Sequence, residues 1–259
     1  MSESRPLKRL IYCVILLLAG CSIPEGRPSN GAQTEQVAEA AWSVGEYEEA
    51  ARLFERAAER DPKSVNALIG LGKSYSELGQ FSRASNALLS AAALRPRNAE
   101  IQGEMGRLAL YQGDAEAALT NYQSALKIDG RNLRALTGFA VSLDYLSRHD
   151  EAQVIYKRAL AAYPTNFPLM SNNALSMVIA GDRSAGIKIL EELVMDSQNG
   201  EAARANLAIA YVLDGRKKDA EAILAGIFSK DEISFEIRKY MEIRKKMTDG
   251  ENVGHLIFI

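Results

Sequence analysis

The sequence contains few of the residues on which specific chemistry depends. Of its 259 residues, only two are cysteine, two are histidine and one is tryptophan. Cys13 and Cys21 are too few for a disulfide framework. His149 and His255 lie far apart in sequence, and no Cys/His cluster has the spacing of metal ligands. We therefore expect no metal site and no cofactor.

Catalytic motifs and an excess of charge are also missing. The chain has no nucleophile-elbow motif and no phosphate-binding glycine loop, and its adjacent acidic pairs are typical of solvated helix faces. The 31 basic and 33 acidic residues leave no basic surface of the kind that nucleic acids require. We expect a protein that is not an enzyme, has no catalytic residues, and binds neither nucleic acid nor a small-molecule substrate.

Long hydrophobic runs are absent except at the start of the chain. The apolar segment 10–18 follows Arg5, Lys8 and Arg9. It is shorter than the roughly 20 residues that a membrane-spanning helix needs. A short basic region, a short apolar run and a small-residue exit together predict a secretory signal peptide over residues 1–20.

The end of this run, Leu18-Ala19-Gly20-Cys21, resembles the lipobox of bacterial lipoprotein precursors. The resemblance implies cleavage after Gly20 and attachment of lipid to Cys21. Several acyl chains would hold the protein stably on a membrane. An ordinary signal peptide, or an uncleaved anchor that happens to contain a cysteine, is the alternative.

The residues after the cleavage site indicate where the anchor would lie. Ser22, where inner-membrane lipoproteins commonly have aspartate, favours by resemblance the outer membrane facing the periplasm. Residues 21–33 are rich in Pro, Gly, Ser and Asn and predict a flexible tether. Loss of residues 1–20 would leave 28 basic and 32 acidic residues, which is a mildly acidic chain.

Most of the remaining chain repeats with a period of 34 residues and no insertion. Small residues recur in two series, and glycines or a serine mark a third: Ala50, Ala84, Ala118, Ala152, Gly186, Ala220; Ala38, Gly72, Gly106, Ala140, Ala174, Ala208; and Gly45, Gly79, Gly113, Ser147, Gly181, Gly215. The small residues allow two helices to pack closely, and the third series fits the turn between them. The period therefore predicts paired helices.

This pattern resembles the tetratricopeptide repeat (TPR) family over residues ~31–232. The resemblance implies an all-α, right-handed solenoid of six helix-turn-helix repeats, which we place at residues 34–232. Such arrays need caps that cover the apolar face of the terminal repeat. The amphipathic segment 233–248 is the expected capping helix, and residues 249–259 form an apolar tail.

In this family the first helix of each repeat lines a concave groove. Carrying the family positions over predicts a protein-binding groove that contains Lys73, Arg107, Tyr111, Tyr145, Asn172, Leu175, Val178, Asn206, Ile209 and Val212. The first four residues suit an extended acidic or polar peptide. Asn172 and Asn206 lie 34 residues apart, where stacked amides can bond a peptide backbone.

The C-terminal half of this groove is apolar. An exposed stripe of Leu175, Val178, Ile209 and Val212 would mark an interaction site. Alternatively, the capping helix or the tail covers the stripe. The basic clamp with which some TPR proteins hold a C-terminal carboxylate is missing, because Glu35, Ile69 and Gly70 stand at its positions.

A lipid-anchored six-repeat chain resembles the pilus-assembly lipoproteins, namely the TadD-like proteins of tight-adherence (Flp) pili and the pilotins of type IV pili. The resemblance implies an adaptor that helps a secretin or another pilus or secretion component to assemble in the cell envelope, with the tight-adherence type favoured. The alternative is an adaptor for peptidoglycan synthesis, polysaccharide export or outer-membrane protein assembly, because the repeat fold alone does not specify a function.

Overall fold

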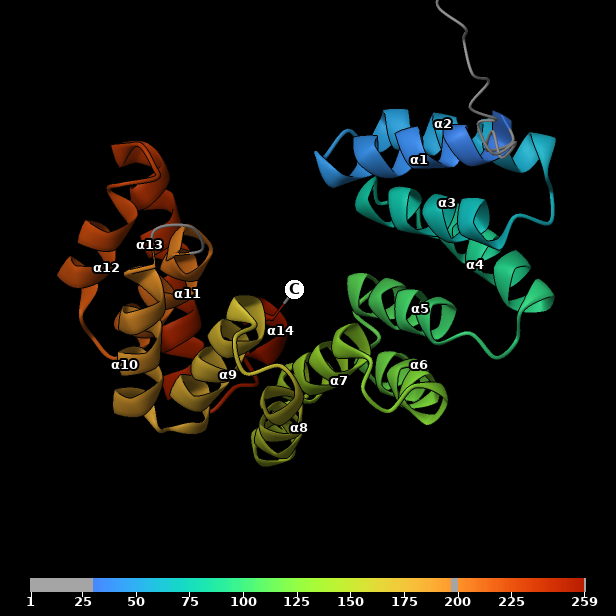
Figure 1. Cartoon of the computed structure of the whole chain (residues 1–259). Coiled ribbons are helices and arrows are strands. Elements are labelled where there is room, and N and C mark those ends of the chain that lie inside the picture. The colour runs from blue at the N-terminus through green and yellow to red at the C-terminus, as the bar shows by residue number, and fades with distance from the viewer. Residues whose placement is uncertain (1–29, 197–199, 259) are drawn as a thin grey trace, which may run out of the picture.

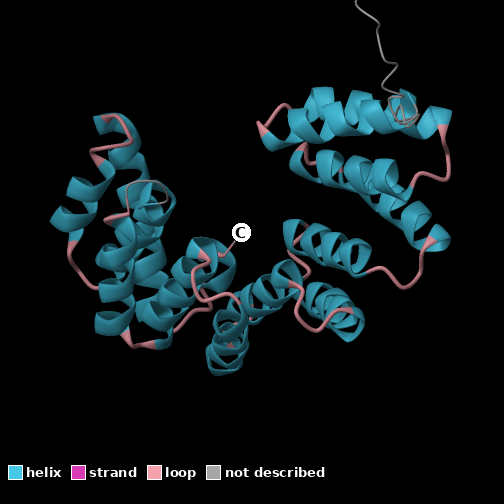
Figure 2. Cartoon of the chain, viewed as in Figure 1, coloured by secondary structure: helices cyan, strands magenta, loops and turns pink. Residues whose placement is uncertain are grey.

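The computed structural model describes residues 30–196 and 200–258. The signal peptide, Cys21 and all but the last few residues of the tether lie outside this range. The described chain is all helical, as the period predicts, and its helices are joined by short loops (Figure 2). In sequence order they are α1 Asn30–Ser43, α2 Tyr47–Arg60, α3 Val65–Glu77, α4 Phe81–Leu94, α5 Ala99–Tyr111, α6 Ala115–Ile128, α7 Leu133–Tyr145, α8 His149–Ala162, α9 Phe167–Ala180, α10 Arg183–Val194, α11 Gly200–Leu213, α12 Lys217–Leu224, α13 Lys230–Thr248 and α14 Gly254–Ile257.

The helices form an arc of antiparallel pairs, with α7 and α8 near its middle (Figure 1). The odd-numbered helices from α1 to α11 contact one another in order and line the inner side of the arc. Each even-numbered helix from α2 to α12 packs behind its odd-numbered partner. The all-α solenoid of six helix pairs and a C-terminal cap is therefore confirmed.

Two series of residues set the ends of these helices. The predicted turn residues Gly45, Gly79, Gly113, Gly181 and Gly215 all have φ between 68° and 108°, and Ser147 has φ 59°. A second series, which the sequence analysis did not identify, caps the inner helices: Ser64, Asn98, Asn132 and Asn166. Each accepts a hydrogen bond from a backbone N–H in the first turn, at 2.8–3.2 Å.

A third series fills the space between the inner and outer helices. Phe54, Leu88, Tyr122, Tyr156, Leu190 and Leu224 are spaced by 34 residues and are all buried. They lie beneath the small residues of the inner helices: a Cβ added to Gly72 would come within 2.6 Å of Leu88. Small residues on one helix and large ones on its partner thus explain the close packing of each pair.

The C-terminal end differs from the expected boundaries at one point. The capping helix begins at Lys230, three residues earlier than predicted, because Ser229 and Glu232 form a capping box there. The tail is not a free extension, since it forms the short helix α14 against α7 inside the arc (Figure 1). No helix in the described part of the chain is long and apolar enough to span a bilayer.

Candidate functional site

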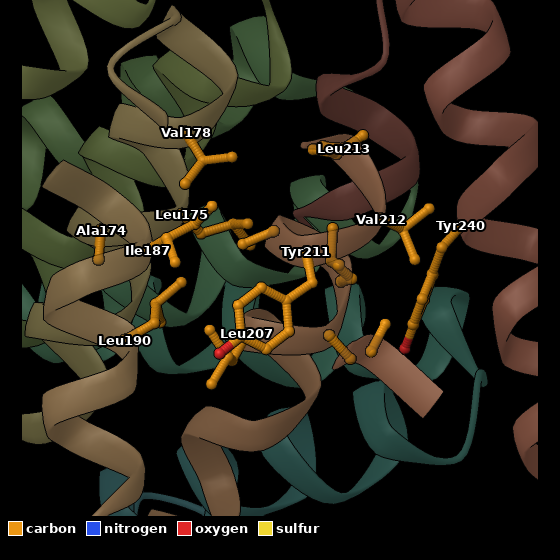
Figure 3. Close-up of a cluster of buried hydrophobic side chains, with 14 of the residues drawn as sticks. Ala174, Leu175, Val178, Ile187, Leu190, Leu207, Tyr211, Val212, Leu213 and Tyr240 are labelled. Atoms are coloured by element: carbon orange, nitrogen blue, oxygen red, sulfur yellow. The ribbon is translucent and has the colours of Figure 1, made fainter. Parts of the chain in front are cut away.

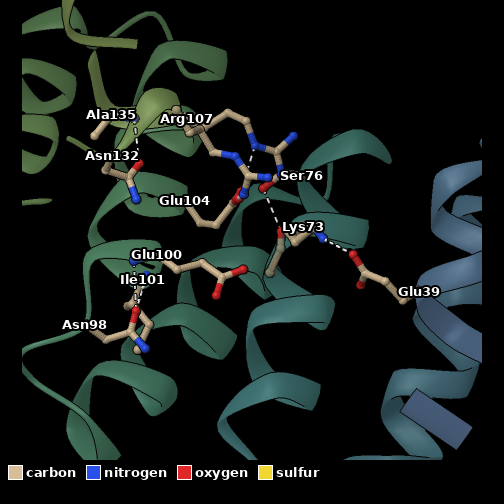
Figure 4. Close-up of polar contacts among 12 residues, drawn as sticks. Glu39, Lys73, Ser76, Asn98, Glu100, Ile101, Glu104, Arg107, Asn132 and Ala135 are labelled. Atoms are coloured by element: carbon tan, nitrogen blue, oxygen red, sulfur yellow. Dashed lines mark hydrogen bonds and ion pairs between the residues drawn. The ribbon is translucent and has the colours of Figure 1, made fainter. Parts of the chain in front are cut away.

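The concave face is the candidate site, because the predicted groove residues all lie on its inner helices. At its N-terminal end, Lys73 is buried, although the prediction placed it in an open groove. Its Nζ lies 2.6 Å from a Glu39 carboxylate oxygen (Figure 4). It also lies 4.1 Å from the centre of the Trp42 ring. Lys73 is therefore already neutralised by the neighbouring repeat.

Arg107 belongs to a larger network at the middle of the arc. Its Nε donates to Glu104 at 2.8 Å (Figure 4). Its Nη1 donates to Glu77. Glu104 is only 2% exposed and also accepts a hydrogen bond from Arg134. Tyr111 donates to Glu77 at 3.1 Å. These contacts tie α3, α5 and α7 together across the groove.

The network also sets the charge states of its members. Burial alone would lower the pKa of Arg107, but Glu104, Tyr111 and Glu77 together more than offset this and raise it. Burial raises the pKa of the Tyr111 hydroxyl. Arg107 is therefore a permanent cation with both carboxylate partners in place. The expectation that Lys73 and Arg107 are free to bind an acidic peptide is corrected, because carboxylates of this chain pair with Lys73 Nζ and with Nε and Nη1 of Arg107. Nη2 of Arg107 is buried and has no hydrogen-bond partner among the described residues.

Tyr145 lies farther along the groove and contacts the tail. Its ring packs edge-on against His255, with centroids 6.0 Å apart. Gly254 comes so close to the end of α7 that an added Cβ would lie 2.1 Å from the backbone oxygen of Asp144. Tyr145 is thus partly covered by the chain itself.

The two asparagines of the C-terminal half have different surroundings. Both are partly buried on adjacent inner helices, as their 34-residue spacing predicts. The Asn206 amide donates to Ser171 at 2.9 Å and is therefore engaged within the chain. No hydrogen bond joins the two amides within the described residues.

The apolar stripe is not open to a partner, so the prediction of an exposed stripe is wrong for this structure. Leu175, Val178, Ile209 and Val212 are between 0% and 8% exposed. They belong to one buried cluster with three residues of α13 and two of the tail, drawn in part in Figure 3: Ile237, Tyr240, Ile243, Val253 and Phe258. The capping helix and the tail cover the stripe, which was the alternative considered.

Two hollows on the concave face lie among the described residues at equivalent places of the repeat array. The first, of about 400 Å³, lies between α1 and α3; its lining includes the Phe54 ring, Gly70 and the carboxylates of Glu35, Glu39 and Glu100. The second, of about 750 Å³, lies between α5 and α7. It is lined by Glu100, Gly103, Arg107, Leu110, Tyr111, Tyr122, Arg134, Thr137, Gly138 and Val141, with five further residues at its margins.

Sequence analysis missed most of the residues that open these hollows. Gly70, Glu104 and Gly138 occupy the same position in three successive repeats, 34 residues apart. At Gly70 and Gly138 the missing side chain leaves room for a ring from the outer helix, Phe54 or Tyr122, respectively. The alternation of glycine and glutamate at this repeat position could have identified the two hollows from the sequence.

One group of described side chains, His149, Asp144 and Ser176, combines the residue types of a catalytic triad. His149 lies 2.8 Å from a carboxylate oxygen of buried Asp144, and the Ser176 hydroxyl donates to that same oxygen. Ser176 is thus bonded to the acid and not to the histidine, unlike an activated nucleophile. Among the described residues no group of histidine, cysteine and acidic side chains could hold a metal ion.

Comparison with known proteins supports the assignment of the fold as a TPR array. Two tetratricopeptide-repeat family models match residues 41–108 and 104–167, so the chain carries TPR repeats. In sequence, it is 35% identical over 86 residues to the uncharacterized protein y4yS of Sinorhizobium fredii, covering 33% of this chain and 47% of that one. It covers 6% of the general transcriptional corepressor trfA of Dictyostelium discoideum, with 30% identity over 84 residues, which are 32% of this chain. The chain thus spans less than half the length of these relatives.

Solved structures match over more of the chain. PilW, described as a widely conserved type IV pilus biogenesis factor, superposes with a TM-score of 0.65 and 19% identity, over 82% of this chain and 98% of PilW. Pseudomonas aeruginosa pilF gives a TM-score of 0.63 and 13% identity, over 82% and 96%. The thermophilic TPR protein TTC0263 of Thermus thermophilus gives 0.64 and 20%, over 70% and 99%. At these identities the likeness shows a TPR solenoid, a fold that binds protein partners.

Proposed function

We propose that this protein is a lipid-anchored adaptor of the bacterial cell envelope that assists the assembly of a pilus or secretion machine. The observation that carries the proposal is the match to PilW, which extends over 98% of that pilus biogenesis factor. The similarity is therefore one of whole arrays and not of two or three shared repeats. The match to pilF over 96% of its length supports the same reading.

The lipobox supplies the location in this proposal. The segment Leu18-Ala19-Gly20-Cys21 lies outside the described residues, and α1 begins only nine residues after Cys21. Acylation of Cys21 would hold the solenoid close to the membrane, and Ser22 favours the outer membrane facing the periplasm. The chain would act there by binding and not by catalysis.

The component bound would be a secretin or another protein of the machine, with the tight-adherence type favoured. A secretin is a multimeric ring, and an adaptor fixed to its target membrane would raise the local concentration of subunits there. The N-terminal half of the concave face is the surface available for this contact, because the C-terminal half is covered by the tail.

The test compares cells that express the wild-type protein, the Cys21→Ser variant or no protein. We expect Cys21→Ser to lose acylation and leave the membrane fraction, or to remain as the unprocessed precursor, and to lower the amount of secretin multimers and surface pili. Crosslinking and co-purification of the wild-type protein should recover a pilus or secretion component. Recovery of peptidoglycan-synthesis, polysaccharide-export or outer-membrane-assembly proteins, with normal pili in the deletion strain, would contradict the proposal and support the alternative adaptor.

A further inference from the structure

The two open hollows lie at equivalent places two repeats apart, and the second contains an unused hydrogen-bond donor. Tyr122 is a residue of the outer helix α6, yet its ring passes beneath the inner helices. A Cβ added to Gly106 would lie 2.9 Å from the ring, and one added to Gly138 would lie 2.2 Å from its Cζ. The two glycines thus form a window through which the ring reaches the α5–α7 hollow.

The Tyr122 hydroxyl has no hydrogen-bond partner among the described residues, although the side chain is only 3% exposed. The charged groups that act on it are those of the groove, chiefly Glu104, Arg107 and Arg134. Burial, followed by Glu104, raises the pKa of Tyr122, so the hydroxyl keeps its proton and can donate it. The hydroxyl lines the open hollow, so an acceptor that enters there would give it a hydrogen-bond partner.

The charges of the groove favour a basic ligand. The two hollows are lined by, or directly bonded to, five carboxylates and three cations, namely Glu35, Glu39, Glu77, Glu100 and Glu104 against Lys73, Arg107 and Arg134. Glu100 lines both hollows. It is exposed, and its carboxylate forms no hydrogen bond or ion pair with any described residue.

We propose that the concave face between α1 and α7 binds an extended, basic segment of the partner protein. Glu100 pairs with a lysine or arginine of that segment, and the Tyr122 hydroxyl donates to one of its backbone carbonyls. Apolar side chains of the segment lie against Phe54 in the first hollow and against Leu110 and Val141 in the second. This inference rests on the adaptor function proposed above, because it names the chemistry of the segment that the adaptor holds.

The spacing of the hollows sets the length of the segment. Packed helices lie about 8–10 Å apart, so two successive inner-helix spacings separate the hollows by roughly 20 Å. An extended chain advances about 3.3 Å per residue, so about six residues join the two anchor points. A decapeptide is therefore long enough to occupy both hollows.

The test is fluorescence polarisation with the purified mature chain and two labelled decapeptides. One peptide carries three lysines among leucines and serines, and the other has glutamates in place of the lysines. We expect the lysine peptide to bind and the glutamate peptide not to bind, with binding that weakens as salt is added. Equal or tighter binding of the glutamate peptide would overturn the proposal.

Three variants assign the contact to the hollows. Glu100→Gln should weaken the lysine peptide about two- to fivefold, and Tyr122→Phe about two- to tenfold. Gly103→Leu should abolish binding, because nothing lies within 4 Å of a Cβ added at Gly103 and the leucine would fill the second hollow. The denaturation midpoint should not fall for Glu100→Gln or Gly103→Leu, since neither change removes a contact.

Matched controls keep the outcome decisive. Glu116→Gln makes the same charge change at an exposed site on α6 that lines neither hollow, and Tyr156→Phe removes the hydroxyl of the next residue in the Tyr122 series, which lies beside Asp144. Neither should alter peptide binding. If the controls weaken binding as much as Glu100→Gln and Tyr122→Phe do, the site is wrong. Because this assay involves no cells, its failure would leave the envelope role standing, and a wrong envelope role would leave peptide binding intact.

Discussion

Single residues at the turns show how strictly the repeat constrains the backbone. At the six equivalent turns the chain takes a positive φ, a conformation that glycine adopts freely and other residues adopt at a cost of about 1–2 kcal/mol. Ser147 is the only non-glycine residue with positive φ among the described residues. The fourth repeat therefore carries a local strain that the other five avoid.

This strain leads to the first prediction. Ser147→Gly should raise the free energy of unfolding by about 0.5–1 kcal/mol, because relief of the positive φ outweighs the greater freedom of glycine in the unfolded chain. Ser147 is exposed, so no packing is lost. Urea denaturation followed by circular dichroism measures the change. The reciprocal control, Gly79→Ser at the equivalent turn of the second repeat, should destabilise by a similar amount; an unchanged midpoint in both variants would show that φ does not limit stability here.

At the scale of single helices, the position of the tail depends on one close contact. Gly254 lies against the end of α7 with no room for a Cβ, since the Asp144 oxygen would be 2.1 Å away. On either side of this contact, Val253 and Phe258 are 3% and 5% exposed. The glycine therefore decides whether these two side chains can stay in the core.

Gly254→Val should lift the tail from α7 and expose the apolar stripe. Loss of the burial of Val253 and Phe258 should lower the free energy of unfolding by roughly 2–4 kcal/mol and increase the binding of the dye ANS. His255→Ala is the control, because His255 is exposed and loses only its edge-on contact with Tyr145. It should cost less than about 1 kcal/mol. A Gly254→Val protein as stable as the control would mean that the tail does not cover the stripe.

The tail also shows where sequence reasoning reaches its limit. The helix pairs and their turns follow from local spacing, and the structure reproduces them at Gly45, Gly79 and the equivalent positions. The docking of Gly254 on Asp144 joins residues more than 100 positions apart and breaks the repeat, so no period could predict it. An apolar stripe looks the same in sequence whether a partner or the chain's own tail covers it.

The polar groove was predictable only in part, for a related reason. The family register placed Lys73 and Arg107 on the inner helices correctly, because register depends on spacing alone. It could not say that Glu39 and Glu77 of the preceding repeats neutralise them. These partners lie 34 and 30 residues earlier, one repeat away on the neighbouring inner helix. Pairing across repeats could therefore be searched for in other sequences of this kind.

At the scale of the whole molecule, the hydrophobic core is divided along the arc. The largest buried cluster joins the fifth and sixth repeats to the cap and the tail (Figure 3), and a separate cluster joins the first two repeats. In such an array each repeat contacts mainly its neighbours, so stability is close to a sum of local terms. A destabilising substitution at one end of the arc should therefore unfold mainly the repeats at that end.

Val178→Asp tests this division. Val178 is 0% exposed and lies in the C-terminal cluster, so a carboxylate there has no water and no partner, and local unfolding should follow. Native-state hydrogen exchange should show lost protection in α9, α10, α11 and α13, whereas α2, α3 and α4 keep theirs. Ala84→Asp is the matched variant, since Ala84 is 0% exposed in the N-terminal cluster, and it should give the converse pattern. Uniform loss of protection along the whole chain in both variants would show that the arc unfolds as one cooperative unit, with the ion pairs of Glu104 and Arg107 at its middle strong enough to couple the two ends.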